Sequence, residues 1–174
     1  MTALQVADAE AAEVSAQLVV LHVGNNSYAV PISRVQEIIR LPEITPLPEA
    51  EAFVEGLINL RGRVLPVVDL ATRLGAGKTE PSKTARVVVA HVGEGQKNEV
   101  GLMVQAVSRV LRVNRSDVEP ASEMAIAGGR GILGVAKLAD ELILLLDLDA
   151  ALAGVEAAAE VGAASRIASE PEGQ

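Results

Sequence analysis

Few residues of this chain have the types and spacing that catalysis or metal binding would require. The sequence contains no cysteine, which removes disulfides, thiolate metal sites and cysteine nucleophiles. His22 and His91 are isolated, and two such histidines make neither a metal site nor a base–nucleophile pair. Asp147 and Asp149 would share one strand face, but Asp69 precedes a leucine in the same way and indicates a structural role. The sequence therefore predicts a protein that is not an enzyme and uses no cofactor or metal.

Gly77-Lys78-Thr79 resembles the end of a phosphate-binding loop. That motif requires a glycine where this chain has Thr72, and Pro81 would obstruct the helix that should follow. We interpret this stretch as a linker between two structural units.

Composition narrows the classes of partner. Hydrophobic residues make up 49% of the chain, enough for a packed core, but aromatic residues are only 1%, namely Tyr28 and Phe53. The core and any binding surface must therefore be aliphatic. Most of the net charge of −8 lies in 1–15 and 153–174, so the middle of the chain is nearly neutral and has no basic stripe. Nucleic-acid binding is disfavoured.

The apolar runs of the chain are short. The run at 143–146 is far below the length of a membrane span, and the first residues lack the basic and apolar regions of a secretory signal. We expect a cytoplasmic protein with no direct membrane insertion.

The middle of the chain has the pattern of an all-β domain. Segments rich in β-branched residues are bounded by Gly, Pro, Asn and Asp, as strands are. The expected strands are 17–23, 27–30, 36–41, 55–60, 63–70, 85–92, 99–104, 108–113, 131–137 and 141–148. Their regular spacing favours a small barrel or sandwich. The ends, 1–15 and 153–174, are expected to be tails, with a possible short helix around 149–160.

An internal repeat divides these strands into two units. The sequence at 18–24 resembles 87–93, 33–35 resembles 108–110, 56–58 resembles 131–133, and 67–70 resembles 145–148. The matches keep their order, so the chain contains two copies of one unit of about five strands. Each unit is too small to be comfortably stable alone. We expect them to pack together and leave a seam.

Specific strings within the repeat resemble the CheW family. They are Y-A-V-P at 28–31, V-Q-E-I-I at 35–39, G-L-I-N-L-R-G at 56–62 and V-L-P-V-V-D-L at 64–70, continued by 100–113 and from 131 onward. The resemblance covers about 16–152, and the N-L-R-G element is its strongest part. It implies two intertwined five-stranded SH3-like β-barrels, at about 18–74 and 85–148. It also implies a scaffold that couples chemoreceptors to the histidine kinase CheA.

The resemblance places receptor contacts at a hairpin and a neighbouring strand. Arg61 and Gly62 lie between two strands, where turn chemistry alone would explain them. By resemblance, Arg61 is an exposed guanidinium that binds polar groups of a receptor helix. Glu37, between Val35 and Ile38, is either an outward strand charge or a receptor contact, and the resemblance favours contact.

The other wall of the receptor site would come from the second unit. Val104 and Val107 are explained most simply as core residues. If exposed, they would complete the aliphatic groove that an amphipathic receptor helix needs.

Two corresponding loops are candidates for contact with the regulatory domain of CheA. The loop at 41–49 carries Ile44 and Leu47, apolar residues where a plain linker would be polar, and its counterpart at 114–124 has the same character. Burial beneath the protein's own barrels is an equally good explanation for each. The expected kinase-contact residues are Ile44, Leu47, Val118, Glu119 and Met124.

The chain departs from the family at two places. Gln105 stands where members often have an acidic residue, and the aromatic residues that some members use at the kinase contact are missing. Three alternatives stay open: a CheW-like module of another receptor–kinase pathway such as twitching motility or surface sensing, an excised regulatory module of a histidine kinase, and a small-molecule sensor that uses the inter-barrel seam.

Overall fold

The computed structural model describes residues 16–120, 131–153 and 155. Within them the chain is almost entirely β-structure, which confirms the expected all-β class. The strands are β1 (Ala16–Val23), β2 (Asn26–Pro31), β3 (Val35–Arg40), β4 (Val54–Leu60), β5 (Arg63–Asp69), β6 (Arg86–Val92), β7 (Asn98–Val104), β8 (Ala106–Val113), β9 (Val118–Pro120), β10 (Ile132–Leu138) and β11 (Glu141–Leu146). The helical turns are η1 (Ile32–Arg34), α2 (Leu70–Arg73), η2 (Glu94–Gln96), η3 (Arg115–Asp117) and α3 (Leu148–Ala151).

Each strand expected from the sequence coincides with an observed one, within a residue or two at the ends. The short strand β9 was not expected, because its three residues include a proline and show no alternation. The helix expected at 149–160 is observed only as α3, and most of that range lies outside the described residues.

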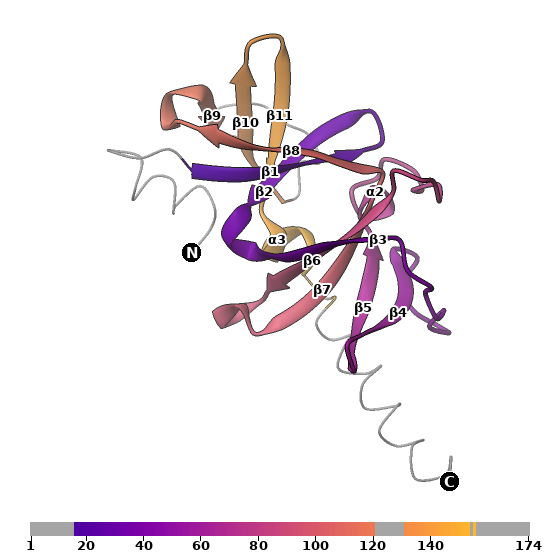
Figure 1. The fold of residues 1–174 in the computed structure, drawn as a ribbon. Helices are drawn as coiled ribbons and strands as arrows, with labels where there is room; N and C mark the ends of the chain where they lie inside the picture. Colours follow the sequence, from indigo (N-terminus) through magenta and orange to yellow (C-terminus); the bar gives the residue numbers. More distant parts are fainter. Residues whose placement is uncertain (1–15, 121–130, 154, 156–174) are drawn as a thin grey trace, which may run out of the picture.

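The strands form two sheets that share both halves of the chain. The six-stranded sheet has the order β8-β1-β2-β11-β10-β9, and the five-stranded sheet has the order β3-β6-β7-β5-β4. Figure 1 shows them as two bodies, one above the other. The expected barrel boundaries, 18–74 and 85–148, are therefore wrong, although the expectation that the barrels intertwine is right.

The physical cause is an exchange of hairpins. The β4–β5 hairpin leaves one edge of β5 open, and β7 pairs with it in parallel, Val67 opposite Gly101. The β10–β11 hairpin leaves an edge of β11 open, and β2 pairs with it in parallel, Leu145 opposite Ala29. The exchanged hairpins are thus β6–β7, which completes the five-stranded sheet, and β1–β2, which completes the six-stranded sheet. Each covers an edge that would otherwise present unpaired backbone groups.

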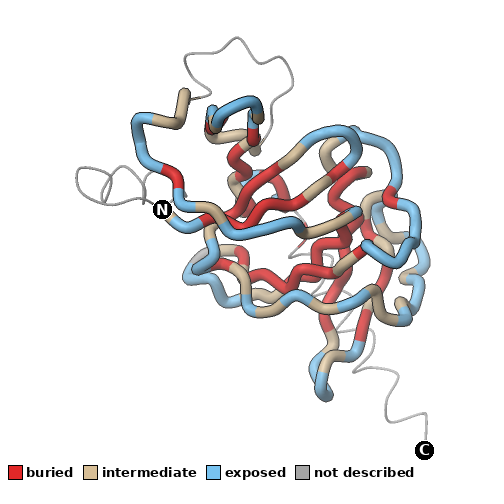
Figure 2. Tube along the Cα trace, turned by 45° about the horizontal axis from the view of Figure 1, so that its top comes forward, coloured by how far each residue is buried: buried red, intermediate tan, exposed pale blue. Residues whose placement is uncertain are grey.

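Three apolar clusters hold this arrangement together. One contains strand residues of the six-stranded sheet, and another contains strand residues of the five-stranded sheet. The largest lies between the sheets and includes Val19 and Val30 from one, Val88 and Leu102 from the other, and Leu148 of α3. Figure 2 shows the buried segments gathered in the interior of the molecule. The seam between the barrels is therefore a packed core rather than an open groove.

The strand pairing defines which positions of the two halves correspond. His22 of β1 opposes Ser27, as His91 of β6 opposes Glu99, so β1 corresponds to β6. Val107 of β8 opposes Leu21 of β1, and Val35 of β3 opposes Ala90 of β6. Leu21 and Ala90 each precede the histidine of their strand, so Val107 corresponds to Val35. Positions 35, 37 and 38 therefore correspond to 107, 109 and 110, and the sequence match of 33–35 with 108–110 is out of register.

The glycine match is also out of register, and backbone crowding shows why. A Cβ on Gly56 would lie 2.0 Å from the carbonyl oxygen of Thr45, and a Cβ on Gly134 would lie 2.6 Å from that of Glu119. Both glycines follow a register shift in their hairpins. Gly56 therefore corresponds to Gly134 and not to Gly131.

Candidate partner-binding surface

Glu37 and Arg61 form a two-point ion pair. Arg61 donates from Nη1 to Oε1 of Glu37 at 2.6 Å and from Nη2 to Oε2 at 2.9 Å. The hydrogen bond from Arg61 holds the pKa of Glu37 below its ordinary value, and the same bond raises the pKa of Arg61. The pair joins β3 to the β4–β5 hairpin, at opposite edges of the five-stranded sheet, so the sheet curls to bring these edges together. The Arg61 side chain remains 67% exposed and has donor capacity left for a partner.

The hairpin presents Arg61 through its backbone conformation. Arg61 and Gly62 have φ values of 53° and 85°, as both central residues of a type I′ turn require. The side-chain oxygen of Asn59 accepts a hydrogen bond from the Gly62 amide at 2.9 Å. The expected roles of Gly62 and Arg61 in a turn thus agree with the geometry, and Arg61 stands at the exposed end of the hairpin.

Val35 and Ile38 precede and follow Glu37 along β3, and they oppose residues of the inter-barrel core. Ile38 opposes Val88, a core residue, yet is 41% exposed because β3 is an edge strand. Val35 packs against the same core and is half-buried. Val107 occupies the corresponding position on β8 and is also half-buried.

Val104 does not belong to this surface. Its side chain is fully buried in the inter-barrel core, so the expectation that it contacts a receptor is wrong. It lies on β7, which is flanked by β6 and β5, and no edge is left to expose it. The alternative weighed for this residue, a core position, is the one observed.

The strand correspondence reveals two surface residues that sequence reasoning missed. Val110 corresponds to Ile38 and is 50% exposed, and Arg109 corresponds to Glu37. Arg109 donates from Nη2 to Oε2 of Glu141 at 2.6 Å, and this bond lowers the pKa of Glu141. Each barrel thus joins its edge strand to a hairpin by an ion pair, but the acidic and basic partners are exchanged. A correctly registered repeat would have pointed to both residues.

The expected kinase-contact residues lie at two corresponding places. Thr45 forms a backbone bridge with Leu57 on the outer edge of β4, and β9 pairs with the outer edge of β10. Ile44 packs partly into the core of the five-stranded sheet, and Val118 packs partly into that of the six-stranded sheet.

The remaining members of that set have different environments. Leu47 is half-buried, and Glu119 forms an ion pair with Lys137 at 2.5 Å. Met124 lies outside the described residues. The described members therefore keep part of their surface accessible, and none is fully buried.

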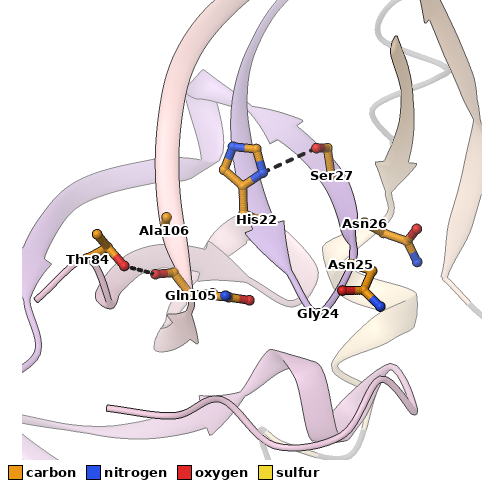
Figure 3. A pocket seen from close by; sticks show the side chains of 8 residues that line it. All are labelled: His22, Gly24, Asn25, Asn26, Ser27, Thr84, Gln105 and Ala106. Carbon is orange, nitrogen blue, oxygen red and sulfur yellow. Dashed lines mark hydrogen bonds between the residues drawn. The ribbon is translucent and has the colours of Figure 1, made fainter. Parts of the chain in front are cut away.

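A shallow pocket of about 320 Å³ lies beside the β1–β2 turn. Its lining combines polar side chains with glycine and alanine and includes no Asp, Glu, Lys or Arg: His22, Gly24, Asn25, Asn26, Ser27, Thr84, Gln105 and Ala106. Figure 3 shows His22 hydrogen-bonded to Ser27, and Thr84 to the backbone of Gln105. The sensor alternative placed a pocket in the apolar seam, but the seam is packed and this pocket lies at the surface.

Hydrogen bonds to Asp69 account for Thr79, the last residue of the stretch that resembles a phosphate-binding loop. The Thr79 hydroxyl donates to Oδ1 of Asp69 at 2.6 Å, and the Thr79 amide donates to Oδ2 at 3.0 Å. Asp69 also accepts from the amide of Ala71 and the hydroxyl of Thr72 at the start of α2. Thr79 lies in the linker between the two repeats and serves as a hydrogen-bond donor to the buried carboxylate at the end of β5.

The chain is similar to known proteins over most of its described residues. Residues 17–156 match the family model of the CheW-like domain. The chain belongs to the CheW family. A chemotaxis protein CheW of Rhizobium meliloti (strain 1021) is 39% identical over 76% of this chain and 84% of its own length. A CheW of Thermotoga maritima is 34% identical over 73% and 81%, respectively.

A solved CheW structure supports the same fold. The crystal structure of the scaffolding protein TtCheW from Thermoanaerobacter tengcongensis superposes with a TM-score of 0.72 at 31% identity, covering 80% of this chain and 93% of that one. The two curled sheets are accordingly the two SH3-like barrels of a CheW fold, the six-stranded one being extended by β9. Among the described residues no helix is long and apolar enough to cross a membrane.

Proposed function

We propose that this chain is a scaffold that couples chemoreceptors to the histidine kinase CheA in chemotaxis signal transduction. The family match over 17–156 and the similarity to a CheW scaffold structure support this function. The observation that carries the assignment of a surface is the Glu37–Arg61 pair, since it holds an exposed guanidinium against β3, the edge strand that also carries Val35 and Ile38.

The proposed receptor surface follows the rim of the inter-barrel core. It comprises Val35, Glu37, Ile38, Arg61, Gly62 and Val107, with Val110 and Arg109 added from the strand correspondence. An amphipathic helix would place its apolar face against the aliphatic side chains and its polar face toward Arg61. Because the chain is poor in aromatic residues, affinity must come from aliphatic burial and charge-assisted hydrogen bonds.

The proposed kinase surfaces are the two outer edges that carry Ile44 with Leu47 and Val118 with Glu119; Met124 remains a sequence-based proposal. Both kinds of surface lie on the same two sheets, which the inter-barrel cluster packs against each other. We therefore expect receptor binding to change the affinity for the kinase through a coupling free energy between the two sites.

A two-arm titration tests the function. The intact chain is titrated with a chemoreceptor cytoplasmic tip in one arm and with the CheA regulatory domain in the other. We expect saturable binding in both arms, and Arg61→Glu should weaken the receptor arm by about tenfold or more, as loss of a charge-assisted contact and repulsion from Glu37 predict. Lys78→Glu, the same charge change on the exposed linker, is the control that should leave both arms unchanged.

The outcomes separate the alternatives. Binding in neither arm would remove the coupling function and favour a small-molecule sensor or a different receptor–kinase pathway. Binding to a receptor tip from a twitching-motility or surface-sensing system alone would assign the module to that pathway. Equal binding by wild type and Arg61→Glu would remove Arg61 from the contact surface.

A further inference from the structure

The chain crosses between the two sheets at η1 and again at Gln105, and the two crossings differ. At η1 the buried side chain of Arg34 joins three elements: its Nε donates to the backbone oxygen of His91 at 2.8 Å, and its Nη2 donates to Oδ1 of Asp149 at 2.5 Å. The same carboxylate oxygen accepts from the Gly93 amide at 2.9 Å. These contacts tie η1, the end of β6 and α3 together.

The corresponding crossing lacks these groups. Ala106 precedes Val107 as Arg34 precedes Val35, and Ala71 follows Asp69 by two residues as Asp149 follows Asp147. His22 and Gly24 stand where the first crossing has His91 and Gly93, and the shallow surface pocket opens there. The fold therefore closes with alanines at this place, so the arginine–aspartate contact is not a general requirement of the crossing.

The position of Arg34 connects it to the proposed receptor surface. Arg34 immediately precedes Val35, the first residue of β3, and Glu37 follows Val35 by two residues. On the other side, Asp149 belongs to α3, whose Leu148 and Ala151 are buried in the inter-barrel core and which follows β11 of the six-stranded sheet. One guanidinium thus links the start of β3 to a helix anchored between the barrels.

We propose that Arg34 and Asp149 form a clasp that positions β3 relative to the six-stranded sheet, and thereby aligns Val35, Glu37 and Ile38 with Val107 and Val110 for a common partner. This inference rests on the proposed receptor surface. The clasp acts as a positioning device, since Arg34 is buried and does not itself touch the partner.

Arg73 supplies a matched control. Its Nε donates to the backbone oxygen of Ala151 at 2.6 Å, so it also holds α3, but from α2 and without a link to β3. Removing Arg73 should loosen the same helix and leave the start of β3 in place. The pair of variants therefore separates general loss of packing from loss of positioning.

The test uses the full chain with Arg34→Met, Asp149→Asn and Arg73→Met. Affinity for the receptor tip and the midpoint of thermal unfolding are measured, together with backbone dipolar couplings that report the orientation of β3 relative to β1 and β8. We expect Arg34→Met to weaken receptor binding by about five- to tenfold, within the usual range of coupling between sites, and to change the couplings of β3. Arg73→Met should lower the midpoint while leaving affinity within twofold and the couplings of β3 unchanged.

Asp149→Asn keeps the shape of the side chain and its acceptor oxygen but removes the negative charge opposite Arg34, so it should act in the same direction with a smaller effect. It also preserves the test if Arg34→Met does not fold. Wild-type couplings of β3 in both clasp variants would overturn the proposal, whether or not a receptor tip binds. If wild type fails to bind the tip, the proposed function fails. Altered β3 couplings in Arg34→Met would still support the clasp, because they are measured without a receptor tip.

Discussion

The Glu37 carboxylate is held ionised chiefly by its hydrogen bond with Arg61. A carboxylate with a lowered folded-state pKa stabilises the native state above its unfolded pKa, and the contribution disappears as the pH falls through the folded value. The contribution is therefore present at neutral pH and is lost in the acidic range below the ordinary glutamate pKa of 4.5. Because the pair is at the surface, its direct effect on stability is small, and its consequence is the orientation of Arg61.

Arg61→Met should raise the pKa of Glu37 back toward its ordinary value, because the hydrogen bond and most of the nearby positive charge are removed. Carboxyl-carbon NMR of the intact protein as a function of pH measures this directly. Arg109→Met should have the corresponding effect on Glu141 and none on Glu37. A Glu37 titration that is the same in wild type and Arg61→Met would show that the pair does not persist in solution.

At the level of elements, β4 depends on Gly56, because the segment at Ile44 and Thr45 passes very close to its backbone. Gly56 has a φ of 151°, and a Cβ there would overlap the backbone carbonyl of Thr45 and approach the side chain of Ile44. Gly62 in the adjacent turn also has a positive φ, but nothing lies within 4 Å of its Cβ position. The two positions separate backbone crowding from backbone conformation within one hairpin.

Gly56→Ala should destabilise the protein by about 3 kcal/mol or more, since backbone atoms must move apart. Gly62→Ala should cost only about 1 to 2 kcal/mol, the penalty of a left-handed conformation. Urea unfolding followed by circular dichroism measures both. A smaller loss for Gly56→Ala than for Gly62→Ala would contradict the close approach of Thr45. Displacement of Ile44 should also weaken the proposed kinase contact in the first variant.

For the whole molecule, the exchanged hairpins make each half of the chain dependent on the other. Fragments 1–80 and 81–174, produced separately, should each fail to fold, because each sheet contains strands from both fragments. Mixed together, they should regain native structure, since the exchanged hairpins can pair across the break. Dispersion of amide NMR signals distinguishes these states. A folded spectrum from either fragment alone would show that a half can close its own barrel.

Much of this protein follows from local sequence patterns. β-branched runs and turn residues predict the strands, because extended backbone and turn conformations are set by neighbouring residues. The turn at Arg61 and Gly62, the structural role of Asp69 and the existence of two repeats were also accessible from the sequence. These features depend on short stretches of chain.

The tertiary structure alone decided how those pieces combine. A repeat does not reveal which hairpin completes which sheet, since β2 and β7 offer equally good edges to either half. β-bulges in β1–β8 and β3–β6 shift the register, so the sequence repeat does not identify Val110 and Arg109. Val104 is buried because β7 is paired on both sides. The pairing of Glu37 with Arg61 and of Arg34 with Asp149 depends on curling and packing between distant segments. Such contacts are set by the closing of the whole core, which no local pattern encodes.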